Sequence, residues 1–366
     1  MTEPDLLPLF CCGFDGTELP DDIRVLLAQG LGGVILFKRN LRDLDQICAL
    51  TAALHRAAPG PLLVGVDQEG GRVVRLPAPF LAPPAAAALG RSGDPDLIRL
   101  VARAVGRELG AAGFNWNLAP VLDVHTNPAN PIIGDRAFSS DPHGVARMGL
   151  AAFRGFEDAG ILTTGKHFPG HGDTAIDSHL ALPESSQPPG RWREVEFVPF
   201  REAIRAGMPS ILLAHLRCPA LDPKTPSSLS RVIVTDILRG ELGFDGVVVS
   251  DDLEMGAIVA EYTIGEAAVR FLEAGGDLIL ICQHADRQRE AFAAVESALR
   301  SGRLSERRVQ ASLGRLARLR QRLNARALAT TPDVVKAVME AEEHQALRAR
   351  VRTATVPQAH PSAGNA

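Results

Sequence analysis

The stretches ELGFDGVVVSDD (241–252) and EAGGDLILIC (273–282) share the pattern that decides the fold. In each, a helix-like segment ends in glycine, and a short apolar run follows. Glycine after a helix supplies the left-handed conformation that ends it, and continuous apolar runs are typical of buried parallel strands. Both stretches therefore predict a helix that leads directly into a buried strand.

The same pattern recurs outward from these stretches, for example in RAGMPSILLAH (205–215) and DAGILTTGKHF (158–168). The apolar runs predict strands at 8–13, 33–37, 62–66, 114–119, 161–165, 210–215, 246–250 and 278–282. Each run is followed by enough chain for a helix, and eight β/α units favour a closed (β/α)8 barrel of the TIM type. An open doubly wound sheet is the alternative, but no G-x-G-x-x-G motif follows the first predicted strand.

The helix starts and the chain length agree with this α/β fold. Asp94-Pro95 and Asp141-Pro142 read as N-caps followed by proline at the first helical position. A chain of 366 residues suits one large barrel, and 305–323 and 332–351 predict additional C-terminal helices. We expect one barrel domain over 1–350 and a disordered tail over 351–366.

Composition excludes several classes of protein. A hydrophobic fraction of 46% excludes a largely disordered chain, and a net charge of −4 without basic clusters gives no indication of nucleic-acid binding. The five cysteines include no C-x-x-C pair, which points to a reducing compartment. The N-terminus lacks the basic start of a secretory signal, and no apolar run approaches the ~18 residues of a membrane span. We expect a cytoplasmic protein with no membrane partner.

Polar residues gather where the predicted strands end, which is where barrel enzymes place their catalytic groups. Residues in such positions are Asp67, Asp123, Arg136, Lys166, His167, His215 and Asp251. Structural roles are the alternatives for some of them: Asp67 as a helix cap or ion-pair partner, and Asp123 as an anchor for its own loop. Of the adjacent Asp251 and Asp252, only one can face the barrel mouth, and alternation does not say which.

The segment 165–179 contains three histidines, one of the chain's four lysines and two aspartates. Its glycines and Pro169 exclude a regular helix, so it is predicted to be a loop. Titratable groups at this density in a cleft indicate a functional site. A metal site built from His167, His171 and Asp173 is an alternative, but paired metal-binding histidines four residues apart usually lie on a helix. We therefore expect no metal and no cofactor.

Four strings in this chain resemble family 3 glycoside hydrolases, in the β-N-acetylhexosaminidase branch. They are VGVDQEGGRVVRL (64–76), NPIIGDRAFS (130–139), KHFPGHGDTAIDSH (166–179) and LGFDGVVVSDDLEMGA (242–257). The resemblance extends from about Leu6 into the 340s. Many members carry a second domain that supplies a glutamic acid as acid/base; in this branch the D-S-H element replaces it.

The resemblance implies a retaining enzyme that removes terminal β-linked N-acetylglucosamine. It implies that Asp251 is the nucleophile, that His179 is the acid/base and that Asp177 orients His179. It also implies a set of sugar-binding residues: Asp67, Arg75, Arg136, Lys166 and His167. Histidine suits proton transfer because its ordinary pKa is about 6.5, and an aspartate partner fixes its tautomer.

These implications lead us to expect a monomeric, cytoplasmic β-N-acetylglucosaminidase. Its expected substrates are small carbohydrates or muropeptides, namely N-acetylglucosaminyl-anhydro-muropeptides released in cell-wall recycling. The alternatives are a β-N-acetylglucosaminide phosphorylase, another β-glycosidase of the family, a non-catalytic sugar-binding protein and a metal-dependent hydrolase.

Overall fold

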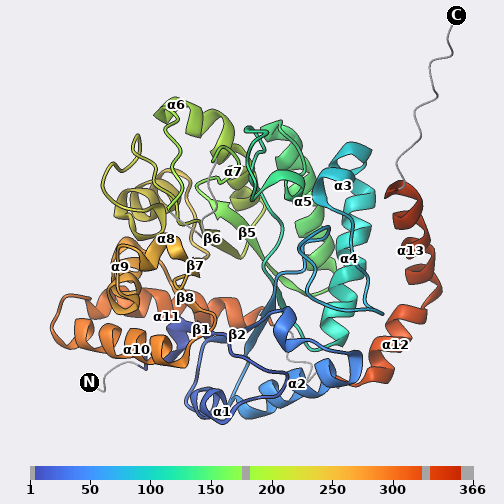
Figure 1. Ribbon diagram of the computed structural model, residues 1–366, viewed down its shortest axis with the longest axis horizontal. Coiled ribbons are helices and arrows are strands. Elements are labelled where there is room, and N and C mark those ends of the chain that lie inside the picture. Colours follow the sequence, from blue (N-terminus) through green and yellow to red (C-terminus); the bar gives the residue numbers. More distant parts are fainter. Residues whose placement is uncertain (1–4, 175–181, 324–329, 356–366) are drawn as a thin grey trace, which may run out of the picture.

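The computed structural model describes residues 5–174, 182–323 and 330–355. Its strands are β1 (Phe10–Cys12), β2 (Gly33–Leu36), β3 (Leu63–Val66), β4 (Trp116–Asn117), β5 (Leu162–Phe168), β6 (Ser210–Leu213), β7 (Val247–Asp252) and β8 (Leu278–Ile281). They form a closed parallel barrel in chain order, in which β1 pairs with both β2 and β8 (Figure 1). The predicted (β/α)8 barrel is confirmed, and each predicted strand overlaps an observed one.

Helices surround the barrel. The α-helices are α1 (Asp21–Ala28), α2 (Leu44–Ala57), α3 (Ala86–Ser92), α4 (Pro95–Ala111), α5 (Pro142–Asp158), α6 (Pro189–Arg191), α7 (Phe197–Arg205), α8 (Gly256–Val259), α9 (Ile264–Ala274), α10 (Ala285–Arg300), α11 (Glu306–Gln321), α12 (Pro332–Glu340) and α13 (Glu342–Thr355). Short 3-10 turns are η1 (Leu7–Leu9), η2 (Lys38–Asn40), η3 (Gly134–Arg136) and η5 (Ser227–Leu229). Two π-helical segments are η4 (Trp192–Glu196) and η6 (Val232–Glu241).

Local sequence explains where these helices begin and end. The Asp94 carboxylate accepts hydrogen bonds from the first backbone N–H groups of α4, and Asp141 does the same for α5. These contacts satisfy donors that have no partner within the helix. Gly275 ends α9 with φ +116°, a conformation that favours glycine. The predicted caps are confirmed.

β5 and β7 both run further than predicted. β7 continues to Asp252. β5 continues to Phe168, so Lys166 and His167 belong to the strand end rather than to the following loop. The Lys166 carbonyl accepts a 2.6 Å hydrogen bond from the Leu122 N–H, which keeps this part within the sheet. The pairing of β5 with β6 shifts in register between Gly165 and Phe168. Such irregularities are common next to active sites, because they redirect side chains.

The C-terminal helices differ from the prediction in one respect. Residues 332–351 were expected to be helical throughout, but the chain is extended at Ala341, with ψ 132°, and this splits the stretch into α12 and α13. The break lets α12 pack against α2 and α4 while α13 packs against α3 and α4 (Figure 1). α13 continues to Thr355, beyond the predicted boundary at 350, and the remaining tail, 356–366, lies outside the described residues. The domain division therefore stays a prediction.

Among the described residues, none of the helices combines the length and the apolar character that crossing a membrane would require.

Candidate active site

A buried lysine connects two acidic residues at the carboxyl end of the barrel. The Lys166 side chain at the end of β5 is only 3% exposed, and its Nζ lies 2.6 Å from Asp67 Oδ1 and 2.6 Å from Glu69 Oε1. Burial alone would lower the pKa of Lys166, but the two carboxylates outweigh it and raise that pKa. Lys166 is therefore an ammonium group fixed between β5 and the segment after β3.

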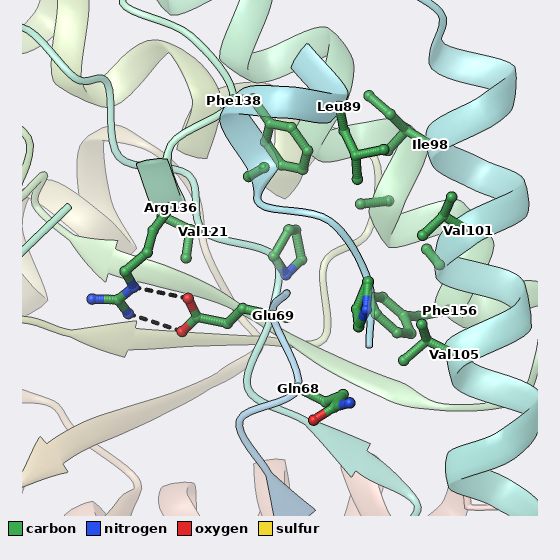
Figure 2. A pocket seen from close by; sticks show the side chains of 16 residues that line it. Gln68, Glu69, Leu89, Ile98, Val101, Val105, Val121, Arg136, Phe138 and Phe156 are labelled. Atoms are coloured by element: carbon green, nitrogen blue, oxygen red, sulfur yellow. Dashed lines mark hydrogen bonds and ion pairs between the residues drawn. The ribbon is translucent and has the colours of Figure 1, made fainter. Parts of the chain in front are cut away.

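Glu69 also forms a two-pronged ion pair with Arg136, whose Nε and Nη2 each lie 2.8 Å from a Glu69 oxygen (Figure 2). Burial would raise the pKa of Glu69, but Lys166 and Arg136 hold it below its usual range. Glu69 is thus ionised, and its carboxylate forms ion pairs with both Arg136 and Lys166. The sequence alone did not reveal this role of Glu69, because its place between two cations depends on contacts across 67 and 97 residues.

A small cavity of about 40 Å³ lies behind this ion pair. Figure 2 shows the Glu69–Arg136 pair on one side and apolar side chains of α3, α4 and α5 around the rest, among them Leu89, Val101 and Phe156. One water needs about 10–15 Å³ of such space, so the cavity has room for a few waters and a hexose does not fit here. The cavity is therefore part of the packing behind the candidate site.

Asp123, in the segment after β4, holds the end of the neighbouring strand β5. Its fully buried carboxylate lies 2.6 Å from His167 Nδ1 and accepts a 2.6 Å hydrogen bond from the backbone N–H of His171. Arg136 Nη2 lies 3.3 Å from the other ring nitrogen, His167 Nε2. One interpretation of the sequence is that Asp123 anchors its own loop; these contacts show that it anchors the end of β5 and the chain that follows. Its position at a strand end was the only sequence signal of this role.

His171 belongs to the segment for which a metal site was considered. Its Nδ1 lies 2.7 Å from Thr174 Oγ1, and burial, together with nearby His167, lowers the pKa of His171 to about 4. The ring is therefore neutral at physiological pH. Within the described ranges, no three His, Cys, Asp or Glu side chains are grouped so that they could hold a metal ion.

Arg75 is held less tightly than Arg136. Its Nη2 lies 3.7 Å from Asp67 Oδ2, and its guanidinium carbon lies 5.9 Å from the centre of the Phe37 ring. The Arg75 Nε is buried and has no hydrogen-bond partner in the part of the chain that the structure describes. A buried donor without a partner is costly, so this geometry suits a ligand that accepts a hydrogen bond from Arg75.

Asp251 and Asp252 at the end of β7 have separate environments. Partial burial would raise the pKa of Asp251, but His215, His167 and Lys166, with the Asp252 N–H, outweigh it and lower that pKa. Asp252 Oδ1 instead accepts hydrogen bonds from two backbone N–H groups, of Glu254 and Cys282. Burial raises the pKa of Asp252 to about 7. Asp251 is therefore the carboxylate that shares the mouth with Lys166 and His167.

Six of the eight predicted site residues are thus at the carboxyl end of the barrel: Asp67, Arg75, Arg136, Lys166, His167 and Asp251. The other two, Asp177 and His179, lie outside the described residues. The chain on either side of them is joined by Asp173, whose Oδ2 accepts hydrogen bonds from Ser185 Oγ at 3.1 Å and Gln187 Nε2 at 2.9 Å.

Comparison with known proteins extends this description. A family model described as "Glycosyl hydrolase family 3 N terminal domain" matches residues 18–319. A β-hexosaminidase from Thiobacillus denitrificans is 42% identical over 288 residues, which span 77% of this chain and 80% of that protein. A β-hexosaminidase from Alkalilimnicola ehrlichii is 40% identical over 288 residues, spanning 76% and 82%.

Solved structures of similar fold also belong to this group of enzymes. A glycoside hydrolase family 3 β-N-acetylglucosaminidase from Paenibacillus sp. aligns with a TM-score of 0.89 at 41% identity, covering 97% of this chain and 69% of that chain. NagZ from Neisseria gonorrhoeae, solved in complex with N-trifluoroacetyl-D-glucosamine, aligns with a TM-score of 0.79 at 32% identity, covering 95% and 98%. The similarity therefore includes the whole barrel.

Proposed function

Because this chain belongs to glycoside hydrolase family 3, we propose that it is a retaining β-N-acetylhexosaminidase that removes terminal β-linked N-acetylglucosamine. The observation that carries this proposal is the setting of Asp251, a carboxylate at the end of β7 whose pKa is lowered by the charges of His215, His167 and Lys166. A nucleophilic carboxylate must remain ionised, and nearby positive charge keeps it so. The relatives named β-hexosaminidase support the choice of sugar.

In the first step, Asp251 attacks the anomeric carbon while the glycosidic oxygen leaves with a proton. The product is a glycosyl ester on Asp251, which water then hydrolyses with the same acid/base group acting in reverse. Two displacements at one carbon retain its configuration. We assign the proton transfers to His179, oriented by Asp177, by carry-over from the family motif.

Two other carboxylates near the predicted strand ends, Glu69 and Glu254, already have partners. Glu69 is paired with both Lys166 and Arg136. Glu254 accepts a 2.6 Å hydrogen bond from the Gln283 N–H, and its Oε1 lies 2.6 Å from His284 Nδ1. Neither carboxylate is poised to give a proton to a leaving group, which supports the histidine.

The sugar itself would be held by the groups around Asp251. Carboxylates and guanidinium groups suit sugar hydroxyls because each offers two hydrogen-bonding positions in fixed geometry. We assign this role to Asp67, Arg75, Arg136, Lys166 and His167. Arg75 is the most accessible of them, since its side chain is 29% exposed, and its Nε has no partner among the described residues.

The finer substrate assignment is N-acetylglucosaminyl-anhydro-muropeptide, processed in the cytoplasm by a monomer without a cofactor. It rests on the branch of the family that the sequence motifs resemble, and on the N-terminus and cysteine pattern described above. The test is a panel of p-nitrophenyl β-glycosides assayed with and without inorganic phosphate. We expect the N-acetylglucosaminide to be cleaved much faster than the glucoside and xyloside, with no need for phosphate. Faster turnover in phosphate, with release of a sugar 1-phosphate, would instead identify a phosphorylase.

Replacing the proposed acid/base gives a sharper test. His179→Ala should slow cleavage of a natural disaccharide by about 10²–10⁴-fold, because its leaving oxygen needs a proton. For an activated aryl glycoside, whose phenol leaves without being protonated, the rate of the first step should fall much less. Asp177→Asn should act in the same direction but more weakly. Equal losses on both substrates would show that His179 only positions the sugar.

A further inference from the structure

The C-terminal helix α13 is attached to α4 by a buried polar contact. Figure 1 shows α13 alongside α4. His344 Nε2 lies 2.6 Å from Glu108 Oε1, and the two side chains are 2% and 3% exposed. The family model ends at residue 319, so α13 lies beyond the region that it matches. A buried acidic group with a well-oriented partner is costly to disturb, which gives this contact a fixed geometry.

The same glutamate also holds the chain that follows β3. Glu108 Oε2 accepts a 2.6 Å hydrogen bond from the Leu81 N–H. Arg348, one turn after His344 on α13, donates a hydrogen bond to the Pro79 carbonyl and lies 3.8 Å from Glu108 Oε1. α13 therefore fixes the segment 79–81 through two of its side chains.

Leu81 in turn supports the backbone of Arg75. The Leu81 carbonyl accepts a hydrogen bond of 3.4 Å from Gln68 Nε2, and Gln68 Oε1 accepts one of 2.9 Å from the Arg75 N–H. Gln68 is only 1% exposed and lies between Asp67 and Glu69 in the chain. A continuous series of hydrogen bonds thus leads from His344 to Arg75.

We propose that His344 and Glu108 are positioning residues that set Arg75 for the sugar, which makes α13 a working part of the glycoside site. The proposal rests on the sugar-binding role of Arg75 given above. Arg75 has only a 3.7 Å approach to Asp67 and a buried Nε without a partner in the described chain, so its side chain depends on where its backbone is held. Arg136, with its two-pronged pair to Glu69, does not depend on this support.

The contact between His344 and Glu108 is the first place to test this. His344→Leu removes the ring nitrogen, whereas His344→Gln keeps an N–H donor at a similar reach. We expect His344→Leu to raise KM for an aryl N-acetylglucosaminide roughly tenfold, the size typical of coupling through a packed network. The kcat should change little, because a binding contact weakened equally in the ground and transition states acts on KM. His344→Gln should restore most of the loss.

Glu343→Gln is the matched control. Glu343 is adjacent to His344 on α13, and its carboxylate pairs with Arg103 and, at 3.0 Å, with Arg107 on α4. This variant weakens the same helix–helix contact without touching segment 79–81, so KM should stay unchanged. A rise in KM equal to that of His344→Leu would mean that α13 acts only by general stabilisation and would overturn the proposal.

Hydrogen exchange supplies a readout that needs no activity. In the full-length protein, His344→Leu should speed exchange of the Leu81 and Arg75 amides, and Glu343→Gln should leave them unchanged. Unaltered exchange at both amides in His344→Leu would reject the network even if the enzyme's substrate proved to be a different sugar. If His344→Leu does not fold, Arg348→Ala removes the second, more exposed support of segment 79–81 and should raise KM in the same direction. An unchanged KM in that variant would then count against the proposal.

Discussion

Two aspartates at opposite ends of the barrel, Asp277 and Asp251, have contrasting surroundings. At the amino end, Asp277 directly precedes β8 and is fully buried. It accepts hydrogen bonds from the Val248 N–H at 2.9 Å, Arg239 Nη2 at 2.5 Å and Ser312 Oγ at 2.7 Å, and Arg308 Nη2 lies 3.2 Å away. Both oxygens of the Asp277 carboxylate have partners, and these contacts join β7, β8, η6 and α11. The carboxylate therefore has no oxygen left to bind a ligand.

At the carboxyl end the charges are only partly matched. Asp251 accepts a 2.9 Å hydrogen bond from the adjacent Asp252 N–H, while Lys166 and His167 influence it from a distance. Arg75 keeps a buried Nε without a partner within the described ranges. Local structure that is less than fully satisfied is typical of functional sites, and barrel enzymes place theirs at this end. The comparison separates carboxylates that hold the fold from those we propose to do chemistry.

The strongest test replaces the proposed nucleophile. Asp251→Ala should lower kcat on the preferred glycoside by about 10⁴-fold or more, since single members of catalytic units contribute this much in other hydrolases. The barrel should remain folded, because Asp251 contributes one short-range hydrogen bond. Turnover and circular dichroism measure the two effects.

Covalent labelling locates the reacting atom. A fluorinated substrate that traps the glycosyl ester should place the label on Asp251. A label on Asp252 would contradict the assignment, because Asp252 Oδ1 is held by the N–H groups of Glu254 and Cys282.

The opposite end should respond through stability. Asp277→Asn leaves Arg239 and Arg308 without their buried counter-charge, and removing one partner of a buried ion pair costs about 3–5 kcal/mol of the free energy of unfolding. Denaturant unfolding measures this loss. The kcat of the folded fraction at low temperature should match the wild type. A lower kcat without lost stability would break the proposed contrast between the two ends.

The smallest expected effect concerns pH and Asp252. Its folded pKa, about 7, lies above the ordinary value of 3.8, so between these values the folded state binds more protons than the unfolded state. Stability from this group is complete below about pH 4 and is lost as pH rises through 7. Asp252→Asn stays neutral and keeps an oxygen acceptor for the two N–H groups. Its melting temperature should therefore fall less than that of the wild type between pH 5 and pH 8.

Asp251→Ala is the internal control for that experiment. The folded pKa of Asp251 is lowered, so its contribution to stability is present above its ordinary pKa and is lost towards acid. Between pH 5 and pH 8 Asp251 is ionised in both the folded and the unfolded state, so Asp251→Ala should nearly keep the pH dependence of the wild type in that range and change it only below about pH 4. Parallel melting curves for wild type and Asp252→Asn would show that Asp252 has an ordinary pKa.

The sequence by itself determined the local features of this protein. Glycine-ended helices, apolar runs and the caps at Asp94 and Asp141 predicted the eight strands and the closed barrel. They depend on neighbouring residues only, which is why they can be read without the fold. The positions of Asp67, Lys166 and Asp251 at strand ends followed from the same pattern.

Only the tertiary structure decided how those positions meet. Lys166 reaches Asp67 across 99 residues, and Asp123 reaches His167 across 44, because β3, β4 and β5 pair side by side in parallel and their carboxyl ends lie together. It also decided the surroundings of the two adjacent aspartates. Asp252 Oδ1 accepts a hydrogen bond from the Cys282 N–H, the charges of His215, His167 and Lys166 act on Asp251, and the register of β7 against β8 shifts between Val249 and Asp252. Alternation along one strand cannot reveal such a shift, because the shift depends on the neighbouring strand.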